Sequence, residues 1–318
     1  MTPPPFARTV LGDVPAGDLG RVNYHEHLFQ VSPLLPGDEL TDEQASQAEA
    51  AALLASGFDA MVDATPVGLG RNPEAVARIS RSTGLSVVAT TGAHRDAHYA
   101  ADSWLRDRDT SALTALFVAD LVDGMPRRDG SEAPAAGPDG EPVRAGVLKA
   151  GIDYWAISAF ERTVLDAVAG AHAETGAPVM VHLEFCTAAH EVLDLLERGG
   201  VAPNRVALAH ADRNPDAGLH LELAARGAFL GYDGMARPKT RTDAELLDLT
   251  ALVVAGGASV LLGGDVARST RYAAYGGMPG LAYLGERYLP RLVARIGDDA
   301  ARGILTDNAQ RWLAWDAR

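Results

Sequence analysis

The sequence predicts a (β/α)8 TIM barrel with a parallel sheet of eight strands. Eight short runs of strand-forming residues recur along the chain, and most are continuously apolar, as expected for parallel strands covered on both faces. Helix-length stretches separate them, and right-handed crossovers of this kind favour a closed barrel. The 318 residues also suit one barrel, a fold that runs to about 250 residues or more with insertions. An open, doubly wound sheet is the structural alternative.

The predicted strands and helices alternate regularly along the chain. The helix-length stretch 156–176 shows the pattern best, because Phe160, Val164, Leu165 and Val168 recur at helical spacing and should line one buried face. The eight expected strands are 22–28, 59–65, 86–93, 145–151, 179–184, 206–212, 229–234 and 260–266.

Residues 1–318 read as a single domain with one loop-like block. Segment 124–142, GMPRRDGSEAPAAGPDGEP, is dense in Gly, Pro and charged residues and precedes the fourth expected strand. Such a composition is typical of a hairpin or a mobile loop. We therefore expect a flexible insertion between the third helix and the fourth strand.

The composition narrows the class of partner. A net charge of −14 argues against general affinity for nucleic acid or anionic membranes, whereas a small-molecule substrate responds to local charge. No apolar run has the length of a transmembrane helix, and the first residues, 1–17, lack the apolar core of a signal peptide. The single cysteine, Cys186, excludes an internal disulfide. These features predict a cytoplasmic protein.

Lysine is rare in this chain. Of 28 basic residues only Lys149 and Lys239 are lysine. An arginine-biased sequence keeps lysine mainly where arginine would fail, and a lysine, unlike an arginine, can lose its proton and act as a nucleophilic amine. Chance retention is the alternative.

Six polar residues fall at the carboxyl ends of the predicted strands, where barrel active sites form. His25 and His27 are two apart on the first strand and so should share a face. Imidazoles and carboxylates suit Zn²⁺, and also Mn²⁺, Fe²⁺ or Co²⁺. Each residue alone has a structural explanation, such as a core histidine or a helix cap, but six at matching depth predict a metal site. The six are His25, His27, Lys149, His182, His210 and Asp265.

At these positions the sequence resembles the phosphotriesterase-like branch of the amidohydrolase superfamily, over essentially the whole chain. The motifs are HEHLF at 25–29, GVLKAG at 146–151, VHLE at 181–184, AHADRNPD at 209–216 and GGDVAR at 263–268. The resemblance implies two divalent ions. His25, His27 and Asp265 would hold the more buried ion and His182 and His210 the other, with a carboxylated Lys149 bridging both.

The implied chemistry is metal-dependent hydrolysis. Two ions lower the pKa of a shared water, so that a bridging hydroxide attacks the substrate while the more exposed ion polarises the scissile bond. Asp265 would take the proton of that hydroxide. Glu184 and Asp212 lie two residues after His182 and His210, and we expect them to orient these ligands or contact substrate.

Four basic residues follow the last two predicted strands, which is a common phosphate-binding place in barrels. They are Arg237, Lys239, Arg268 and Arg271. The pattern is similar to sugar-phosphate lactonases of the family, which implies that Lys239 and Arg268 grip a phosphate. One departure stands out, because Arg271 occupies a position where that subgroup tends to have tyrosine.

Residues after the third predicted strand also resemble family residues near the substrate. They lie in the segment TGAHRDAHY at 91–99, where His94 and Tyr99 are the candidate substrate contacts and Arg95 lies between them.

The sequence thus predicts a binuclear-metal hydrolase that opens a phosphorylated or otherwise anionic sugar lactone. A lactonase acting on acyl-homoserine lactones would want a long apolar channel, and a phosphotriesterase would leave the four basic groups without a partner. Hydrolysis of an amide or another ester, and a metal-binding barrel without turnover, are also compatible with these residues. Family members are often homodimers, and the sequence leaves the oligomeric state open.

Overall fold

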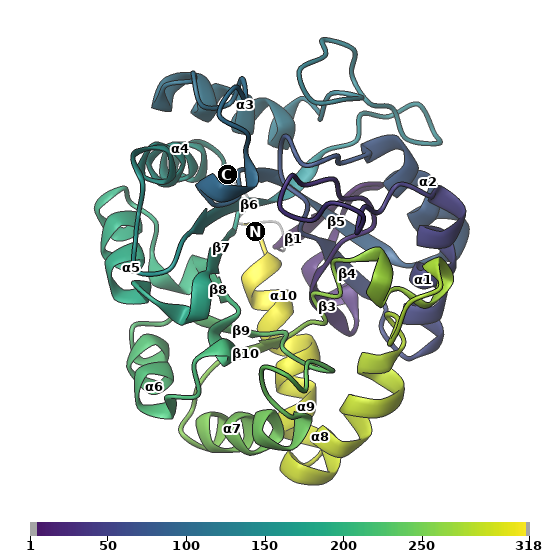
Figure 1. The fold of residues 1–318 in the computed structure, drawn as a ribbon, viewed down its shortest axis with the longest axis vertical. Coiled ribbons are helices and arrows are strands. Elements are labelled where there is room, and N and C mark those ends of the chain that lie inside the picture. Colours follow the sequence, from purple (N-terminus) through teal and green to yellow (C-terminus); the bar gives the residue numbers. More distant parts are fainter. Residues whose placement is uncertain (1–4, 316–318) are drawn as a thin grey trace.

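The computed structural model of the chain describes residues 5–315 and confirms the predicted barrel (Figure 1). Its eight strands pair in chain order, and every pair is parallel. Each coincides with a predicted strand. The bounds are β3 (Val22–Glu26), β4 (Ala60–Asp63), β5 (Ser86–Gly92), β6 (Ala145–Ile152), β7 (Val179–Leu183), β8 (Val206–Ala209), β9 (Phe229–Tyr232) and β10 (Val260–Leu262).

The first and last strands meet at their carboxyl ends. The backbone N–H of Asp265, just after β10, donates to the carbonyl of His25 in β3 at 3.0 Å. The next N–H, of Val266, donates to the buried carboxyl of Glu26 at 3.0 Å. These bonds close the sheet beside the residues expected to bind metal.

Helices surround the strands (Figure 1). In α4, Ser158 and Glu161 form a capping box, and Val164, Leu165 and Val168 are buried as predicted while Phe160 is half-buried. The bounds are α1 (Glu43–Ala55), α2 (Pro73–Thr83), α3 (Thr110–Val122), α4 (Ala159–Thr175), α5 (Ala189–Arg198), α6 (Ala217–Ala225), α7 (Asp243–Ala255), α8 (Leu289–Ile296), α9 (Asp298–Arg302) and α10 (Asn308–Leu313). No helix within residues 5–315 has both the length and the apolar character needed to cross a bilayer.

The amino end of the barrel is closed by elements that the sequence did not suggest. An antiparallel hairpin of β1 (Phe6–Thr9) and β2 (Gly12–Pro15) precedes the barrel, and α10 packs beneath it. Trp312 of α10 is fully buried, and its indole N–H donates to the carbonyl of Val179, the first residue of β7, at 3.1 Å. Within residues 5–315 this end is filled by side chains, and the cavity lined by the expected ligand residues lies at the carboxyl ends of the strands. Residues 1–4 of the segment expected to lack a signal core lie outside the described residues.

Segment 124–142 lies between α3 and β6, as predicted, and forms an irregular hairpin. Arg71, at the end of the loop after β4, anchors it through an ion pair with Asp129 at 2.6 Å and also contacts Asp120 of α3 at 2.7 Å. The Arg71 side chain is only 6% exposed. The predicted insertion is therefore tied to the barrel by a buried charge cluster, and its flexibility stays a prediction.

Candidate metal centre and active site

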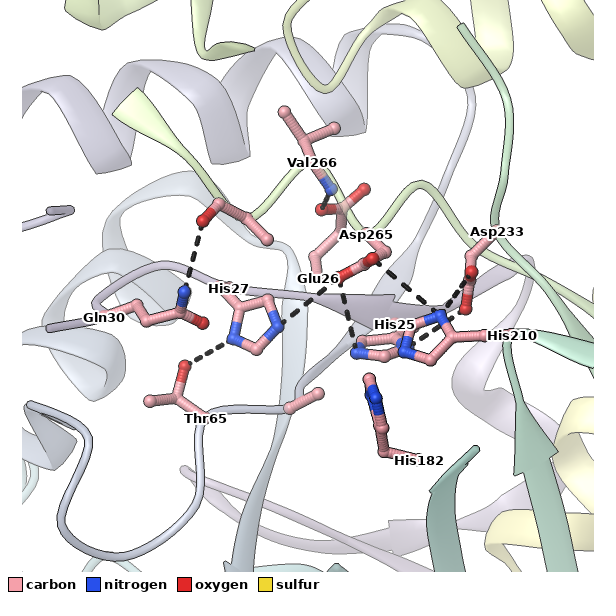
Figure 2. A network of polar contacts seen from close by, with 12 residues as sticks. His25, Glu26, His27, Gln30, Thr65, His182, His210, Asp233, Asp265 and Val266 are labelled. Carbon is pink, nitrogen blue, oxygen red and sulfur yellow. Dashed lines mark hydrogen bonds and ion pairs between the residues drawn. The ribbon is translucent and has the colours of Figure 1, made fainter. Parts of the chain in front are cut away.

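The structure brings the six predicted ligand residues to one end of the barrel, all of them buried. Figure 2 shows five of them, His25, His27, His182, His210 and Asp265. They lie near or just after the carboxyl ends of five strands. The four imidazole rings gather with the carboxylate of Asp265 around one space. Two of the residues, His210 and Asp265, have positive φ angles of 62° and 42°. Non-glycine residues adopt such angles only under strong constraint, and they cluster at functional sites.

A β-bulge determines which residues of β3 face the barrel interior. The register against β4 shifts between Asn23 and Glu26, so one extra residue is accommodated. Tyr24 and His25, neighbours in sequence, therefore both reach Asp233 inside the barrel. Simple alternation along a strand does not predict this.

His25, His27 and Asp265 form one group that could hold a metal ion. The Nε2 atoms of both histidines lie 3.7 Å from the Asp265 Oδ1 atom, and the three donor atoms are within 4.8 Å of one another. Two imidazole nitrogens and a carboxylate oxygen converging in this way are a typical donor set for a divalent transition metal.

The hydrogen bonds of His27 leave its Nε2 atom free to bind a metal ion. Its Nδ1 lies 2.7 Å from the Thr65 hydroxyl, which itself donates to the carbonyl of Phe29 at 2.7 Å. Because the hydroxyl has a single hydrogen, Nδ1 of His27 must be the donor. The lone pair of Nε2 then faces Asp265 and is available to a metal.

Asp233, at the end of β9, orients two further imidazoles. Its carboxylate contacts Nδ1 of His25 at 3.1 Å and Nδ1 of His210 at 2.7 Å (Figure 2). It also accepts the Tyr24 hydroxyl. Burial alone would raise the pKa of Asp233, but the adjacent His210 and His25 hold it well below its usual value. His25, His210 and Asp233 could also group around an ion. Because the carboxylate already accepts three hydrogen bonds, we assign it to orientation of the rings.

His182 of β7 contains an unpaired buried atom. Its Nε2 lies 3.1 Å from Oε2 of Glu184, while its Nδ1 has no hydrogen-bond partner among residues 5–315. An orphaned ring nitrogen in a buried site is costly unless something outside the protein binds it. Glu184 therefore has the orienting role expected for it. Asp212 instead accepts the backbone N–H groups of Asp233 and Gly234 and shapes the loop after β9.

Burial keeps the imidazoles in the neutral form that binds metals. It lowers the pKa of His27 to about 3 and of His210 to about 4, and it lowers that of His182 well below the usual value. Lys149 of β6 is fully buried, and its Nζ donates to the carbonyl of Ala64 at 2.6 Å. Burial lowers the pKa of this amine to about 8, so roughly a tenth of it is uncharged at pH 7 and about half at pH 8.

The catalytic cavity above these residues has a volume of about 960 Å³ and includes all four predicted basic residues. Arg237 donates to the Asp265 carboxylate at 3.0 Å. Arg271 reaches the backbone carbonyls of Asp265, Val266 and Met235 at 3.3–3.4 Å and makes no ion pair within residues 5–315. Lys239 is exposed at the rim, and Arg268 is half exposed and paired with Asp38 at 3.2 Å.

The two candidates after β5 have different positions. His94 lines the catalytic cavity, with its ring 4.4 Å from that of His182. Tyr99 is buried and is not among the residues lining the cavity; its hydroxyl donates to the carbonyl of Val67 and accepts the N–H of His94, both at 2.9 Å. The structure thus places Tyr99 behind His94. His98, which the sequence did not single out, lines the cavity with its ring 3.8 Å from that of His94.

Sequence reasoning also missed Arg213, whose guanidinium lies 3.1 Å from the Asp265 carboxylate and 3.5 Å from Glu184. It missed the orienting roles of Thr65 and Asp233 as well. Position at a strand end was a signal for all three, because Thr65 and Asp233 lie at the ends of the predicted strands 59–65 and 229–234, and Arg213 directly follows 206–212. Arg213 also lies within the motif AHADRNPD.

Comparison with known proteins agrees with this geometry. The model of the phosphotriesterase family matches residues 6–313. A phospho-furanose lactonase of Mycoplasmopsis synoviae is 30% identical over 98% of this chain and 93% of its own. The crystal structure of a lactonase from Listeria monocytogenes superposes with a TM-score of 0.86 at 29% identity, over 98% of this chain and 99% of that one. An amidohydrolase from Mycoplasma synoviae superposes with a TM-score of 0.91 at 29% identity, over 99% and 93% of the two chains.

Three observations point to the same family. The family model spans nearly the whole chain, the relatives have similar length, and histidine and aspartate side chains that could hold a metal cluster at the strand ends. Members of this family are metal-dependent hydrolases. The chain belongs to the phosphotriesterase family and is a hydrolase.

Proposed function

We propose that this chain hydrolyses an anionic sugar lactone, with a phosphorylated furanose lactone as the leading candidate. One observation carries the proposal. The guanidinium of Arg271 lies in the same cavity as the four ligand histidines, yet it contacts only backbone carbonyls and no carboxylate within residues 5–315. A partly buried cation without an anionic partner favours an anionic ligand.

The donor set fits two divalent ions. His25, His27 and Asp265 would hold one ion and His182 and His210 the other, through the ring nitrogens that protein hydrogen bonds leave free. Lys149, as a carbamate formed from its neutral amine and CO₂, would bridge them. We expect Zn²⁺, and the same nitrogen and oxygen donors also accept Mn²⁺, Co²⁺ or Fe²⁺. The bound ions would activate water at neutral pH and polarise the lactone carbonyl.

The residues of the chain supply the remaining steps. Nearby Arg237 and His25 hold the pKa of Asp265 well below its usual value despite burial, so its carboxylate is ionised and can accept a proton. Water adds to the lactone carbonyl carbon, the ring C–O bond breaks, and the proton taken by Asp265 passes to the departing alkoxide. The product is the open hydroxy acid.

The basic residues select the substrate. Arg271 and Arg237 are positioned to bind the anionic group inside the cavity, with Lys239 and Arg268 at the rim as further contacts. The phospho-furanose lactonase name of the relative from Mycoplasmopsis synoviae supports a phosphate as that group. A neutral phosphotriester or a long acyl-homoserine lactone would leave Arg271 without an anionic partner.

The test is a panel assayed with a pH indicator on the zinc-loaded protein. The panel contains a phosphorylated furanose lactone, its unphosphorylated counterpart, an acyl-homoserine lactone and a neutral phosphotriester. We expect the highest kcat/KM for the phosphorylated lactone. Arg271→Ala should raise KM for that substrate by about 10- to 100-fold, the loss expected for a charge-assisted hydrogen bond, and should change KM for the unphosphorylated lactone by less than about 2-fold.

Arg295→Ala is the matched control, because Arg295 is an exposed arginine on α8 that pairs with Asp248. It should behave as the unchanged protein. An Arg271→Ala variant that weakens both lactones equally would refute recognition of the anion by Arg271. A phosphotriester as best substrate would refute the proposed function.

A further inference from the structure

Exposed aromatic side chains gather beside the catalytic cavity. Tyr154 and Trp155, after β6, are 57% and 68% exposed, and Phe185, after β7, is 45% exposed. Within residues 5–315 these are the large aromatic side chains that are exposed to this degree. Aromatic residues normally bury most of their surface, so three together at a cavity mouth mark a binding surface. We call Tyr154, Trp155 and Phe185 the aromatic rim.

The backbone of the aromatic rim is held in place. Trp155 and Phe185 have φ angles of 53° and 54°, a left-handed conformation that non-glycine residues avoid. The N–H of Trp155 donates to the Thr187 hydroxyl at 3.0 Å, and that hydroxyl donates to the carbonyl of Glu184 at 2.7 Å. The loops after β6 and β7 are thereby joined, and the backbone that carries the rings is held in place before any ligand arrives.

The aromatic rim is continuous with the catalytic cavity. A second hollow of about 480 Å³ is lined by the rim together with Thr187, Arg213 and Asn214, among others. Phe185 and Arg213 also line the catalytic cavity, so they form the wall common to both. Arg213 contacts Asp265 at 3.1 Å, which places the second hollow one side chain away from the proposed proton acceptor.

The ring contacts within the aromatic rim leave room for the ring of a ligand. Tyr154 meets Trp155 and Phe185 edge to face, with ring centroids 6.5 and 6.0 Å apart. No pair of the rim is stacked face to face, so flat ring surfaces remain available to a ligand. The loop after β10, which carries Arg271, lies across the mouth, because β6 and β10 are four strands apart in the eight-stranded ring.

We propose that the aromatic rim is a second substrate subsite that stacks against a planar, apolar ring carried by the substrate. The inference rests on the proposed function and narrows its substrate class. The substrate would be a lactone with an anionic group directed toward Arg271 and an aryl-type ring directed toward Trp155, with the scissile carbonyl between them over the ligand histidines. A monosaccharide lactone would fill only the catalytic cavity.

The test uses a ligand that cannot be hydrolysed. 4-Phenylbutanoate carries a carboxylate and a phenyl ring, and butanoate is its match without the ring. Among the tryptophans, Trp155 is the exposed one, whereas Trp104 is half-buried and Trp312 and Trp315 are buried. We expect saturable quenching of tryptophan emission by 4-phenylbutanoate and at least about 10-fold weaker binding of butanoate.

Variants test whether the aromatic rim itself binds the ring of the ligand. Trp155→Phe should abolish the emission change while retaining most of the affinity, because a ring remains. Tyr154→Ala and Phe185→Ala retain the reporter and should each raise the Kd for 4-phenylbutanoate by about 5- to 20-fold without changing that for butanoate. Leu252→Ala, at an exposed apolar position on α7, is the control and should match the unchanged protein.

The outcomes separate the two proposals. Saturable binding of 4-phenylbutanoate without turnover of any lactone would support the subsite and refute the proposed function. Lactone hydrolysis with equal affinity for 4-phenylbutanoate and butanoate would refute the subsite alone. If Tyr154→Ala left ligand affinity unchanged and converted a dimer to a monomer in sedimentation, the rim would be an interface between copies, and the subsite would be refuted.

Discussion

At the scale of single residues, the proposed metal centre depends on the side chains that hydrogen-bond to its histidines. Thr65, Asp233 and Glu184 each accept a hydrogen bond from a histidine proposed as a metal ligand and leave its other nitrogen free. Such contacts set the tautomer and the ring orientation together. Asp233 is the most consequential, because it serves two rings and is fully buried.

Replacing Asp233 tests this arrangement. In Asp233→Asn the amide oxygen can accept from one imidazole, but the amide NH₂ faces the N–H of the other ring. We therefore expect zinc affinity to fall by about 10- to 100-fold, as for other residues that orient metal ligands. Competition with a chromogenic chelator measures the change.

Tyr24→Phe provides the comparison. It removes the third hydrogen bond to Asp233 but retains both imidazole contacts, so its zinc affinity should stay within about 3-fold of that of the unchanged protein. Zinc affinity in Asp233→Asn equal to that of the unchanged protein would contradict the assigned role.

At the scale of elements, the strand ends and their polar residues could be predicted, whereas the contacts between distant loops could not. His25, Lys149 and His182 were found because continuous apolar runs mark buried parallel strands, and active sites form where those strands end. The inward direction of Tyr24 was not predicted, because it depends on a β-bulge that the alternation of residues along a strand does not reveal. The contact of Thr65 with His27 was not predicted, because only the folded barrel brings the two residues together.

Segment 124–142 is the element on which composition and structure differ most. Its Gly, Pro and charged residues predict a flexible insertion, but the Arg71 cluster lies far away in sequence and could not be read from the segment. Arg71→Met would leave Asp120 and Asp129 without their buried cation, at a cost of about 3–5 kcal/mol. We expect the segment to detach and trypsin to cleave after Arg127 or Arg128 at least about 10-fold faster.

A solvent-exposed anchor of the same segment gives the control. Arg81 pairs with Asp139, and the two side chains are 50% and 62% exposed. Arg81→Met should leave the cleavage rate unchanged, since an exposed ion pair contributes about 0–1 kcal/mol. Equally rapid cleavage of the protein with Arg71 intact would show that the cluster does not restrain the segment.

At the scale of the whole molecule, the metal centre and the closure of the barrel share residues. His25 would supply a ligand nitrogen, and its carbonyl accepts the N–H of Asp265, so β3 and β10 meet where the metal would bind. A ligand that binds only the folded chain stabilises it by mass action. Metal loading should therefore raise the stability of the entire barrel.

The effect should depend on pH through Lys149. Burial lowers the pKa of its amine to about 8, so below that pH the site contains an ammonium that repels cations and cannot form a carbamate. As pH rises through about 8 the proton is lost and metal binding strengthens. His27 and His210, with pKa values of about 3 and about 4, stay neutral throughout this range and add no slope.

We therefore expect zinc at about 100 times its Kd to stabilise the fold by about 2.7 kcal/mol, which raises Tm by roughly 5 °C for a chain of this size. At fixed zinc and dissolved CO₂, the rise in Tm should be larger at pH 8.5 than at pH 6.5, as measured by differential scanning calorimetry. Lys149→Met should reduce the rise at both pH values and remove the difference between them. A metal-induced rise that is the same at both pH values in the unchanged protein would argue against Lys149 as part of the centre.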